Sequence, residues 1–227
     1  MKSDAKSTIE TGKAILGIEL GSTRIKAVLI DQENKPIAQG NHTWENQLVD
    51  GLWTYSIEAI WSGLQDCYAD LRSNVKNLYG IEIENLAAIG VSAMMHGYMP
   101  FNVKEEILVP FRTWRNTNTG RAAAALSDLF VYNIPLRWSI SHLYQAILDN
   151  EAHVKDIDFL TTLAGYVHWQ LTGEKVLGIG DASGMLPIDP TTHNYSAEMV
   201  AKFDKLIAPN QYNWTLQDIL PKVLSGR

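Results

Sequence analysis

The stretch "AILGIELGSTRIKAVLID" (residues 14–31) decides the fold. Two apolar runs rich in branched residues, 14–20 and 23–31, are typical of β-strands. Gly21 and Ser22 between them form a turn short enough to join the strands as a hairpin. The residue that stands out is Glu19, an acid close to the end of the first run. It is either a solvated residue at a strand end or a carboxylate retained for function.

The segments that follow extend this hairpin into an α/β fold. Residues 37–44 predict a third strand after the turn "QENKP", which makes an antiparallel meander. Residues 54–78 predict a long helix that ends at Gly80. Its apolar residues recur every three or four positions: Ile57, Ile60, Trp61, Leu64, Cys67, Tyr68, Leu71, Val75 and Leu78. The apolar run "LAAIGVSA" (residues 86–93) then predicts a parallel strand covered on both faces.

The second half of the chain is predicted to be mostly helical. Helices are expected over residues 118–130, 141–149, 160–171 and 196–206, with Gly173 ending the third. The polar residues 1–13 predict a disordered or loose tail. We find no internal repeat, linker or charged block, so residues 14–227 are expected to form one domain.

Composition limits the classes of function. The chain has 227 residues, of which 46% are hydrophobic, and this supports a packed core. A net charge of −6 argues against nucleic acid as a partner, although a nucleotide needs only a few backbone amides and a metal ion. Cys67 is the single cysteine, which excludes an internal disulfide and a multi-cysteine zinc site. With no apolar run of 18 residues and no signal-like start, we expect a cytoplasmic protein without a membrane contact.

The first candidate site is the opening hairpin. Successive backbone N–H groups of Gly21, Ser22 and Thr23 can point at a phosphate, and the two hydroxyls add donors. Glu19 could then lie beside a Mg²⁺ ion, directly or through water. The alternative is an ordinary hairpin with a solvated acid, and on this motif alone that alternative is favoured.

The second candidate is "SAMMHG" (residues 92–97), directly after the apolar strand. Ligands of α/β sheets gather at the carboxyl ends of such strands, so His96 and the backbone of Met95 are placed to meet a polar ligand. The alternative is a core histidine under a methionine-lined turn, which is the usual situation for a lone histidine.

The third candidate is "RTWRNTNTGR" (residues 112–121). Trp114 offers a flat face for the C–H groups of a sugar, and Arg115 and Asn116 offer hydrogen bonds to hydroxyls. The alternative is a surface turn in which Thr117 or Asn118 caps the next helix, and both descriptions can hold together.

The segment "GIGDASG" (residues 178–184) does not have the spacing of a dinucleotide-binding fingerprint. We interpret it as a turn with an N-cap at Asp181 or Ser183, and a packing role is favoured over a ligand role.

These motifs, in this order, resemble the FGGY family of carbohydrate kinases. The matching stretches span residues 14–190 and are "GIELGSTRIKAVLID", "AAIGVSAMMHGYM", "TWRNTNTGRAA", "YNIPLRWSISHLYQAILDN", "HWQLTGE" and "GDASGMLPID". The resemblance implies an α/β, ribonuclease H-like domain of the superfamily that contains actin, sugar kinases and the Hsp70 ATPase. Its core would be a mixed five-stranded sheet in the order β-β-β-α-β-α-β-α, with helical insertions.

The resemblance also implies roles for individual residues. The turn of Gly21, Ser22 and Thr23 matches the family's first phosphate-binding hairpin, and Glu19 stands where the family usually has Asp on the metal side. The resemblance implies that the sugar contacts Met95, His96 and Trp114. Trp138 lies near a further sugar-contacting position of the family. Asp181 and Ser183 match a segment that we regard as structural.

Two clues to the sugar disagree. The "MHG" turn is similar to that of xylulose kinases, which favours a xylulose-like pentose, whereas the spacing of "WRNTNTGR" is closer to deoxysugar kinases. A larger departure is length, because family members continue into a second domain that binds ATP and begins with the catalytic Asp. We therefore expect the general base beyond Arg227, no catalytic residue and no tightly bound ATP or Mg²⁺ in this chain, and an inactive isolated domain. Its exposed face allows a homodimer.

The expected function of the full-length parent is therefore phosphoryl transfer from ATP to a ketose or polyol, with this chain holding the small-molecule sugar. The principal alternative is a non-catalytic sugar-binding or regulatory module of the same fold, in which Glu19 marks lost chemistry. A chaperone-like or filament-forming actin relative leaves the aromatic sugar-site positions unexplained.

Overall fold

The computed structural model describes residues 2–224, and these form two compact units. The first unit comprises the residues up to 47 together with 55–94. The second comprises residues 48–54 and the chain from residue 95 onward. The sequence shows no linker between the two units. The boundary after residue 94, for example, lies inside the motif "SAMMHG" (residues 92–97).

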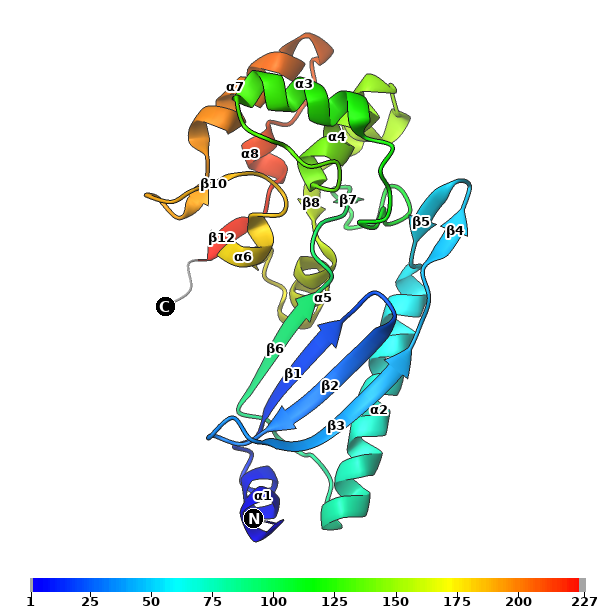
Figure 1. Cartoon of the computed structure of the whole chain (residues 1–227), viewed down its shortest axis with the longest axis vertical. Helices are drawn as coiled ribbons and strands as arrows, with labels where there is room; N and C mark the ends of the chain where they lie inside the picture. Colours follow the sequence, from blue (N-terminus) through cyan, green and yellow to red (C-terminus); the bar gives the residue numbers. More distant parts are fainter. Residues whose placement is uncertain (1, 225–227) are drawn as a thin grey trace. The chain divides into compact units, whose positions relative to one another are not determined.

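A four-stranded mixed sheet forms the first unit (Figure 1). Its strand order is β3 (Pro36–Thr43), β2 (Arg24–Ile30), β1 (Ile15–Leu20) and β6 (Ala88–Ala93). The first three strands are antiparallel neighbours, and β6 pairs with β1 in parallel. The predicted meander and the parallel strand are confirmed. In the described residues this sheet has four strands, not the five expected, because the later strands pair with one another in the second unit.

Helix α2 (Ile57–Tyr79) packs on one face of the sheet (Figure 1). Ser56 caps its start by accepting a hydrogen bond from the Ala59 N–H, and Gly80 ends it in a left-handed conformation (φ 70°), as predicted. A Cβ on Gly40 of β3 would lie 2.3 Å from the Cys67 carbonyl oxygen of α2. Only glycine therefore allows this close approach of strand and helix.

Two expectations for the first unit are wrong. Residues 2–10 form a helix, α1 (Lys2–Glu10), where we expected a loose tail, and Ile9 is only 2% exposed. That buried side chain anchors the segment. Strand β6 is not covered on both faces, since Ile89 is 53% exposed. It is an edge strand, and its apolar composition alone could not distinguish an edge from an interior position.

The second unit is mainly helical. Its longer helices are α3 (Gly120–Phe130), α4 (Ser139–Leu148), α5 (Leu163–Thr172) and α7 (Ala197–Ile207). The short helices are α6 (Ile179–Ala182), α8 (Leu216–Ile219), η1 (Ala152–Asp156) and η2 (Ala208–Asn210). The predicted helices are confirmed to within three residues at each end, and Gly173 ends α5 at φ 79°.

Short strand pairs join these helices. They are β4 (Gln47–Val49) with β5 (Leu52–Thr54), β7 (Met99–Phe101) with β8 (Phe159–Thr161), β9 (Val176–Gly178) with β12 (Lys222–Leu224), and β10 (Ile188–Asp189) with β11 (Asn194–Tyr195). The predicted helix over 160–171 starts three residues late because its first residues belong to β8. The N-cap of α3 is Thr119, not Thr117 or Asn118.

Candidate functional site

The turn between β1 and β2 is closed by its own backbone. The Gly21 N–H donates to the Arg24 carbonyl at 3.0 Å. A Cβ on Gly21 would lie 2.9 Å from that carbonyl oxygen, so this position requires glycine because of space and not because of its φ angle. Local sequence thus dictates the hairpin.

The carbonyl groups of this turn are held by two aromatic residues. The Trp44 Nε1–H donates to the Gly21 carbonyl at 2.7 Å, and the Tyr55 hydroxyl donates to the Ser22 carbonyl at 2.5 Å. The two rings stack with their centroids 4.1 Å apart. Within residues 2–224, no hydrogen bond involves the backbone N–H groups or the hydroxyls of Ser22 and Thr23. The turn therefore offers donors to an anion while its acceptors are occupied.

Glu19 lies beside this turn. Its Oε1 atom is 3.8 Å from the place where a Cβ on Gly21 would stand, and its Oε2 atom is 3.8 Å from the Lys26 Nζ. The side chain is 56% exposed and borders an open hollow of about 420 Å³. The hollow is lined by Gly17, Glu19, Lys26, Val28, Gly90 and Ser92. The acid is thus on the solvent-facing side of β1, in register with Ser92 of β6.

Glu19 is a single carboxylate in this hollow. In the described part of the chain, no group of three or more His, Cys, Asp and Glu residues could hold a metal ion. Mg²⁺ in phosphate sites commonly takes one or two carboxylates, several waters and phosphate oxygens. One exposed carboxylate beside free backbone N–H groups fits such a shared arrangement.

In the second unit, the turn after β6 has a strained backbone. His96 has a φ of 70° and Gly97 a φ of 112°. A Cβ on Gly97 would lie 2.6 Å from the Phe111 ring and 2.9 Å from the Arg112 carbonyl oxygen. Positive φ in a non-glycine residue costs free energy and is often found at functional positions. Met95, next to it, is 42% exposed.

The imidazole of His96 packs against the segment that was predicted to be only a structural turn. Its Nδ1 atom lies 3.4 Å from the Gly184 carbonyl oxygen. Partial burial lowers the pKa of His96, and the positive charge of Arg137 lowers this pKa further. The ring is therefore neutral at pH 7 and can both donate and accept a hydrogen bond.

Asp181 also belongs to this group. Its Oδ2 atom accepts a hydrogen bond from the Thr162 hydroxyl at 2.5 Å, and burial raises the pKa of its carboxyl group. Asp181 lies inside α6 and Ser183 is the C-cap of that helix, so the predicted N-cap at either residue is wrong. The "GIGDASG" segment supports His96 directly, a contact that no local pattern in the sequence indicates.

The third motif divides into separate roles. The Asn116 side chain is buried, accepts from the Trp53 N–H at 2.9 Å and donates to the Trp53 and Thr113 carbonyls. The Arg115 guanidinium lies over the Trp53 ring, 3.6 Å from its centroid. Because both amide N–H groups of Asn116 donate to backbone carbonyls and its oxygen accepts from the Trp53 N–H, we no longer expect this side chain to contact sugar hydroxyls.

Trp114 is left as the half-buried aromatic face of this loop. The Arg137 guanidinium lies 5.4 Å from the centroid of its ring. Trp138, the next residue, is half-buried at the N-cap position of α4, with its ring centroid 6.4 Å from that of Tyr132. Arg137 forms no ion pair within the described residues, and no motif in the sequence points to it.

A buried network connects the His96 turn to the Trp114 loop. The backbones of Tyr98 and Arg112 exchange two hydrogen bonds, at 2.9 and 3.2 Å. The Arg112 guanidinium forms a two-pronged ion pair with Glu151, and the Tyr98 hydroxyl lies 2.8 Å from the His153 Nε2. These contacts join the two predicted sugar-binding segments within the second unit.

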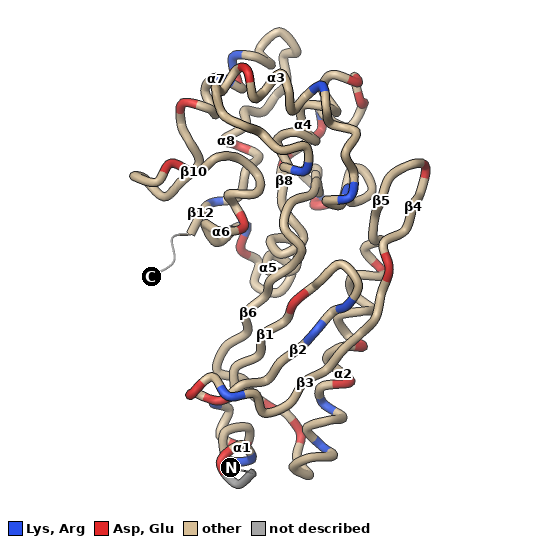
Figure 2. The backbone as a smooth tube through the Cα atoms, viewed as in Figure 1, with Lys and Arg blue, Asp and Glu red and all other residues tan. Residues whose placement is uncertain are grey.

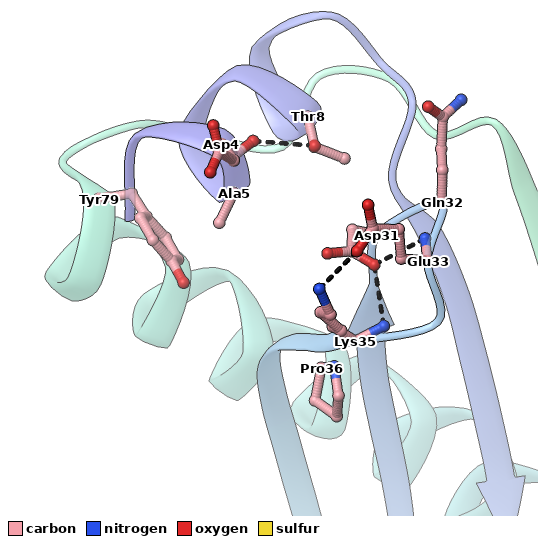
Figure 3. A pocket seen from close by; sticks show the side chains of 9 residues that line it. All are labelled: Asp4, Ala5, Thr8, Asp31, Gln32, Glu33, Lys35, Pro36 and Tyr79. Atoms are coloured by element: carbon pink, nitrogen blue, oxygen red, sulfur yellow. Dashed lines mark hydrogen bonds and ion pairs between the residues drawn. The ribbon is translucent and has the colours of Figure 1, made fainter. Parts of the chain in front are cut away.

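Another hollow in the first unit is lined by charged side chains that bond to the protein itself. Figure 3 shows Asp4, Asp31, Glu33, Lys35 and Tyr79 around it. The Asp31 Oδ1 atom accepts from the backbone N–H groups of Glu33 and Lys35, and Lys35 pairs with Glu33. These charged groups stabilise the β2–β3 turn and satisfy one another.

Charge and helix hydropathy are properties of the whole described chain. Figure 2 shows acidic and basic residues interspersed along both units. In the described residues, no helix is both long and apolar enough to cross a lipid bilayer.

Comparison with known proteins places this geometry in a family. The model of the FGGY family of carbohydrate kinases, N-terminal domain, matches residues 14–226. The xylulose kinase of Klebsiella pneumoniae is 20% identical over 197 residues, which cover 83% of this chain and 40% of that protein. The chain thus spans about 40% of the length of the curated relatives it matches.

Solved structures show the same fold. The ligand-bound xylulose kinase from Lactobacillus acidophilus superposes with a TM-score of 0.75 at 18% identity, covering 93% of this chain and 42% of that one. The gluconate kinase from the same organism gives a TM-score of 0.76 at 18% identity, with the same coverage. The expected α/β fold of the sugar-kinase and actin type is therefore confirmed.

Proposed function

Because this chain belongs to the FGGY family of carbohydrate kinases and corresponds to their N-terminal domain, we propose that it is the sugar-binding part of an ATP-dependent kinase. The kinase transfers the γ-phosphoryl group of ATP to a hydroxyl of a ketose or polyol, and a xylulose-like pentose is the favoured substrate. The cytoplasm, where ATP is abundant, is the proposed location.

The observation that carries this proposal is that the β1–β2 hairpin offers donors to an anion, whereas the His96 and Trp114 segments offer groups that suit a sugar. The hairpin of the first unit has its carbonyls occupied and its Ser22 and Thr23 N–H groups unused within the described chain. The second unit joins a neutral imidazole, an aromatic face and a buried carboxyl group through His96, Trp114 and Asp181. Phosphoryl transfer needs mainly positioning and charge neutralisation, and such groups supply both.

In the proposed enzyme, Mg²⁺ neutralises charge on the phosphate oxygens. Glu19 would hold the hydration shell of that ion, and the turn of Gly21, Ser22 and Thr23 would donate hydrogen bonds to the transferred group. Trp114 would stack on the sugar, with Met95, His96 and Trp138 bordering it. Arg115 would remain at the rim, stacked on Trp53.

The catalytic base and the ATP site are assigned to a C-terminal domain of the parent enzyme. A general base removes the proton from the attacking hydroxyl, and we propose that an Asp beyond Arg227 does so. The isolated chain would then bind sugar without turning over ATP. A homodimer is compatible with this proposal.

The test is a coupled ATP-consumption assay of the full-length enzyme with a panel of ketoses, polyols and sugar acids. Turnover on one of them, with negligible turnover by the isolated chain, supports the proposal. Turnover by the isolated chain at the ~1–100 s⁻¹ typical of kinases contradicts the assignment of the base. Sugar binding without ATP turnover in the full-length protein would support the alternative, a non-catalytic sugar-binding module, which the Glu at position 19 favours.

A further inference from the structure

We infer that Trp44 and Tyr55 are positioning residues that aim the Ser22 and Thr23 N–H groups at the phosphoryl group. This inference rests on the proposed function and concerns how its phosphate-binding turn is prepared. Neither residue belongs to the turn, and neither was selected from the sequence.

The geometry of the peptide bond couples each carbonyl group to the N–H of the next residue. In a trans peptide, the C=O of one residue and the N–H of the next lie in one plane and point in opposite directions. No peptide bond in the described chain is cis. A group that holds the Gly21 carbonyl therefore also fixes the direction of the Ser22 N–H. In the same way, a group that holds the Ser22 carbonyl fixes the direction of the Thr23 N–H.

Both carbonyls are held from the aromatic side. The Trp44 indole N–H donates to the Gly21 carbonyl at 2.7 Å, and the Tyr55 hydroxyl donates to the Ser22 carbonyl at 2.5 Å. The Trp44 backbone N–H also donates to the Thr23 carbonyl at 3.2 Å. Three successive peptide planes are thus held, and two successive N–H groups point away from the aromatic pair.

The aromatic pair is itself rigid. Trp44 is 6% exposed and Tyr55 is 2% exposed, and their rings are stacked at an interplanar angle of 26°. Trp44 directly follows β3 and Tyr55 directly precedes Ser56, the N-cap of α2, and these two elements pack closely on each other. Donors on such a support need no reorganisation when an anion arrives, which is the condition for strong electrostatic stabilisation.

The test uses Tyr55→Phe and Trp44→Phe, which keep an aromatic ring and remove the hydrogen bond. Each has a matched control. The Tyr79 hydroxyl donates to the Ile37 carbonyl at 3.0 Å, and the Trp214 Nε1–H donates to the Val154 carbonyl at 2.9 Å. Tyr79→Phe and Trp214→Phe therefore remove the same kind of bond away from the turn.

The first measurement follows the Ser22 and Thr23 amide resonances of this chain by NMR during titration with inorganic pyrophosphate. We expect both amides to shift in the wild type and in the two controls. We expect about 3- to 10-fold weaker binding in Tyr55→Phe and Trp44→Phe, which is the effect of one lost hydrogen bond. Equal affinity in the variants and their controls, or no shift at either amide in the wild type, overturns the inference.

The second measurement separates positioning from stability in the full-length enzyme. A positioning role lowers kcat in Tyr55→Phe by about 3- to 10-fold while the KM for the sugar is unchanged, and Tyr79→Phe keeps the wild-type kcat. An unchanged kcat in Tyr55→Phe overturns the inference. A full-length enzyme without kinase activity contradicts the proposed function alone, because the NMR titration reads the turn without catalysis.

Discussion

The imidazole of His96 rests on the backbone of Gly184, with the Nδ1 atom 3.4 Å from the carbonyl oxygen, although 88 residues separate the two. A Cβ on Gly184 would lie 2.7 Å from that same nitrogen. The absence of a side chain at position 184 therefore sets the position of the His96 ring, which we propose to border the sugar.

Gly184→Ala is expected to weaken sugar binding with little loss of stability. The added methyl group must displace the His96 ring, the free end of a side chain, so the backbone need not move. Misplacing a binding group in this way costs about tenfold or more. Calorimetric titration with the sugar measures the effect, and Gly180→Ala is the control because its Cβ meets no atom within 4 Å. Wild-type affinity in Gly184→Ala would remove His96 from the binding site.

Asn116→Ala is expected to destabilise the protein. The substitution leaves the Trp53 N–H without its partner and removes one of the two donors to the Trp53 carbonyl, and such losses cost about 1–3 kcal/mol of unfolding free energy. Urea denaturation measures the change. Asn118→Ala in the same loop is the control, since Asn118 is exposed and should unfold like the wild type. A stable Asn116→Ala variant with weakened sugar binding would restore the original expectation for this residue.

His142 is expected to make stability depend on pH in the acidic range. Burial lowers the pKa of His142 to about 3, and its Nε2 atom has no hydrogen-bond partner within the described chain. In the unfolded chain, His142 has an ordinary pKa near 6.5 and binds a proton at a pH at which the folded chain does not bind one. The contribution is therefore fully present above about pH 6.5 and is lost as the pH falls toward 3.

The size of this effect follows from the slope of about 1.4 kcal/mol per pH unit for one proton. Between pH 6.5 and 5, His142 should account for a loss of about 2 kcal/mol. Urea denaturation of the wild type and of His142→Leu at the two pH values isolates that loss, because the variant lacks the titrating group. Equal pH dependence in the two proteins would show that folding does not lower the pKa of His142.

Glu19→Gln is expected to lower the kcat of the full-length kinase by about 10²-fold, an effect typical of removing one group that stabilises transferred charge. Stability should hardly change, because the side chain is 56% exposed and its contact with Lys26 is a surface ion pair. Glu19→Asp, which keeps the charge, is the matched control and should retain activity. Full activity of Glu19→Gln at every Mg²⁺ concentration would exclude a metal-side role.

The local parts of the fold were predictable from sequence. Two apolar runs rich in branched residues, joined by the turn at Gly21, predicted the β1–β2 hairpin, and a three- and four-residue spacing with Gly80 predicted α2 and its end. The exposed edge position of β6 was not predictable, because an apolar run looks the same whether one or both of its faces are covered. The helix at residues 2–10 was missed because one buried residue, Ile9, anchors a polar segment.

The candidate site divides in the same way. The sequence by itself determined the fold class, through motifs that follow one another in a fixed order, and the turn at Gly21, which depends on residues that are neighbours along the chain. Only the tertiary structure decided that Asn116 holds a strand, that Gly184 supports His96, and that Trp44 and Tyr55 orient the turn. Each of these assignments depends on a hydrogen bond between residues at least 20 positions apart, and side-chain identity does not reveal which partner a polar group will find after folding.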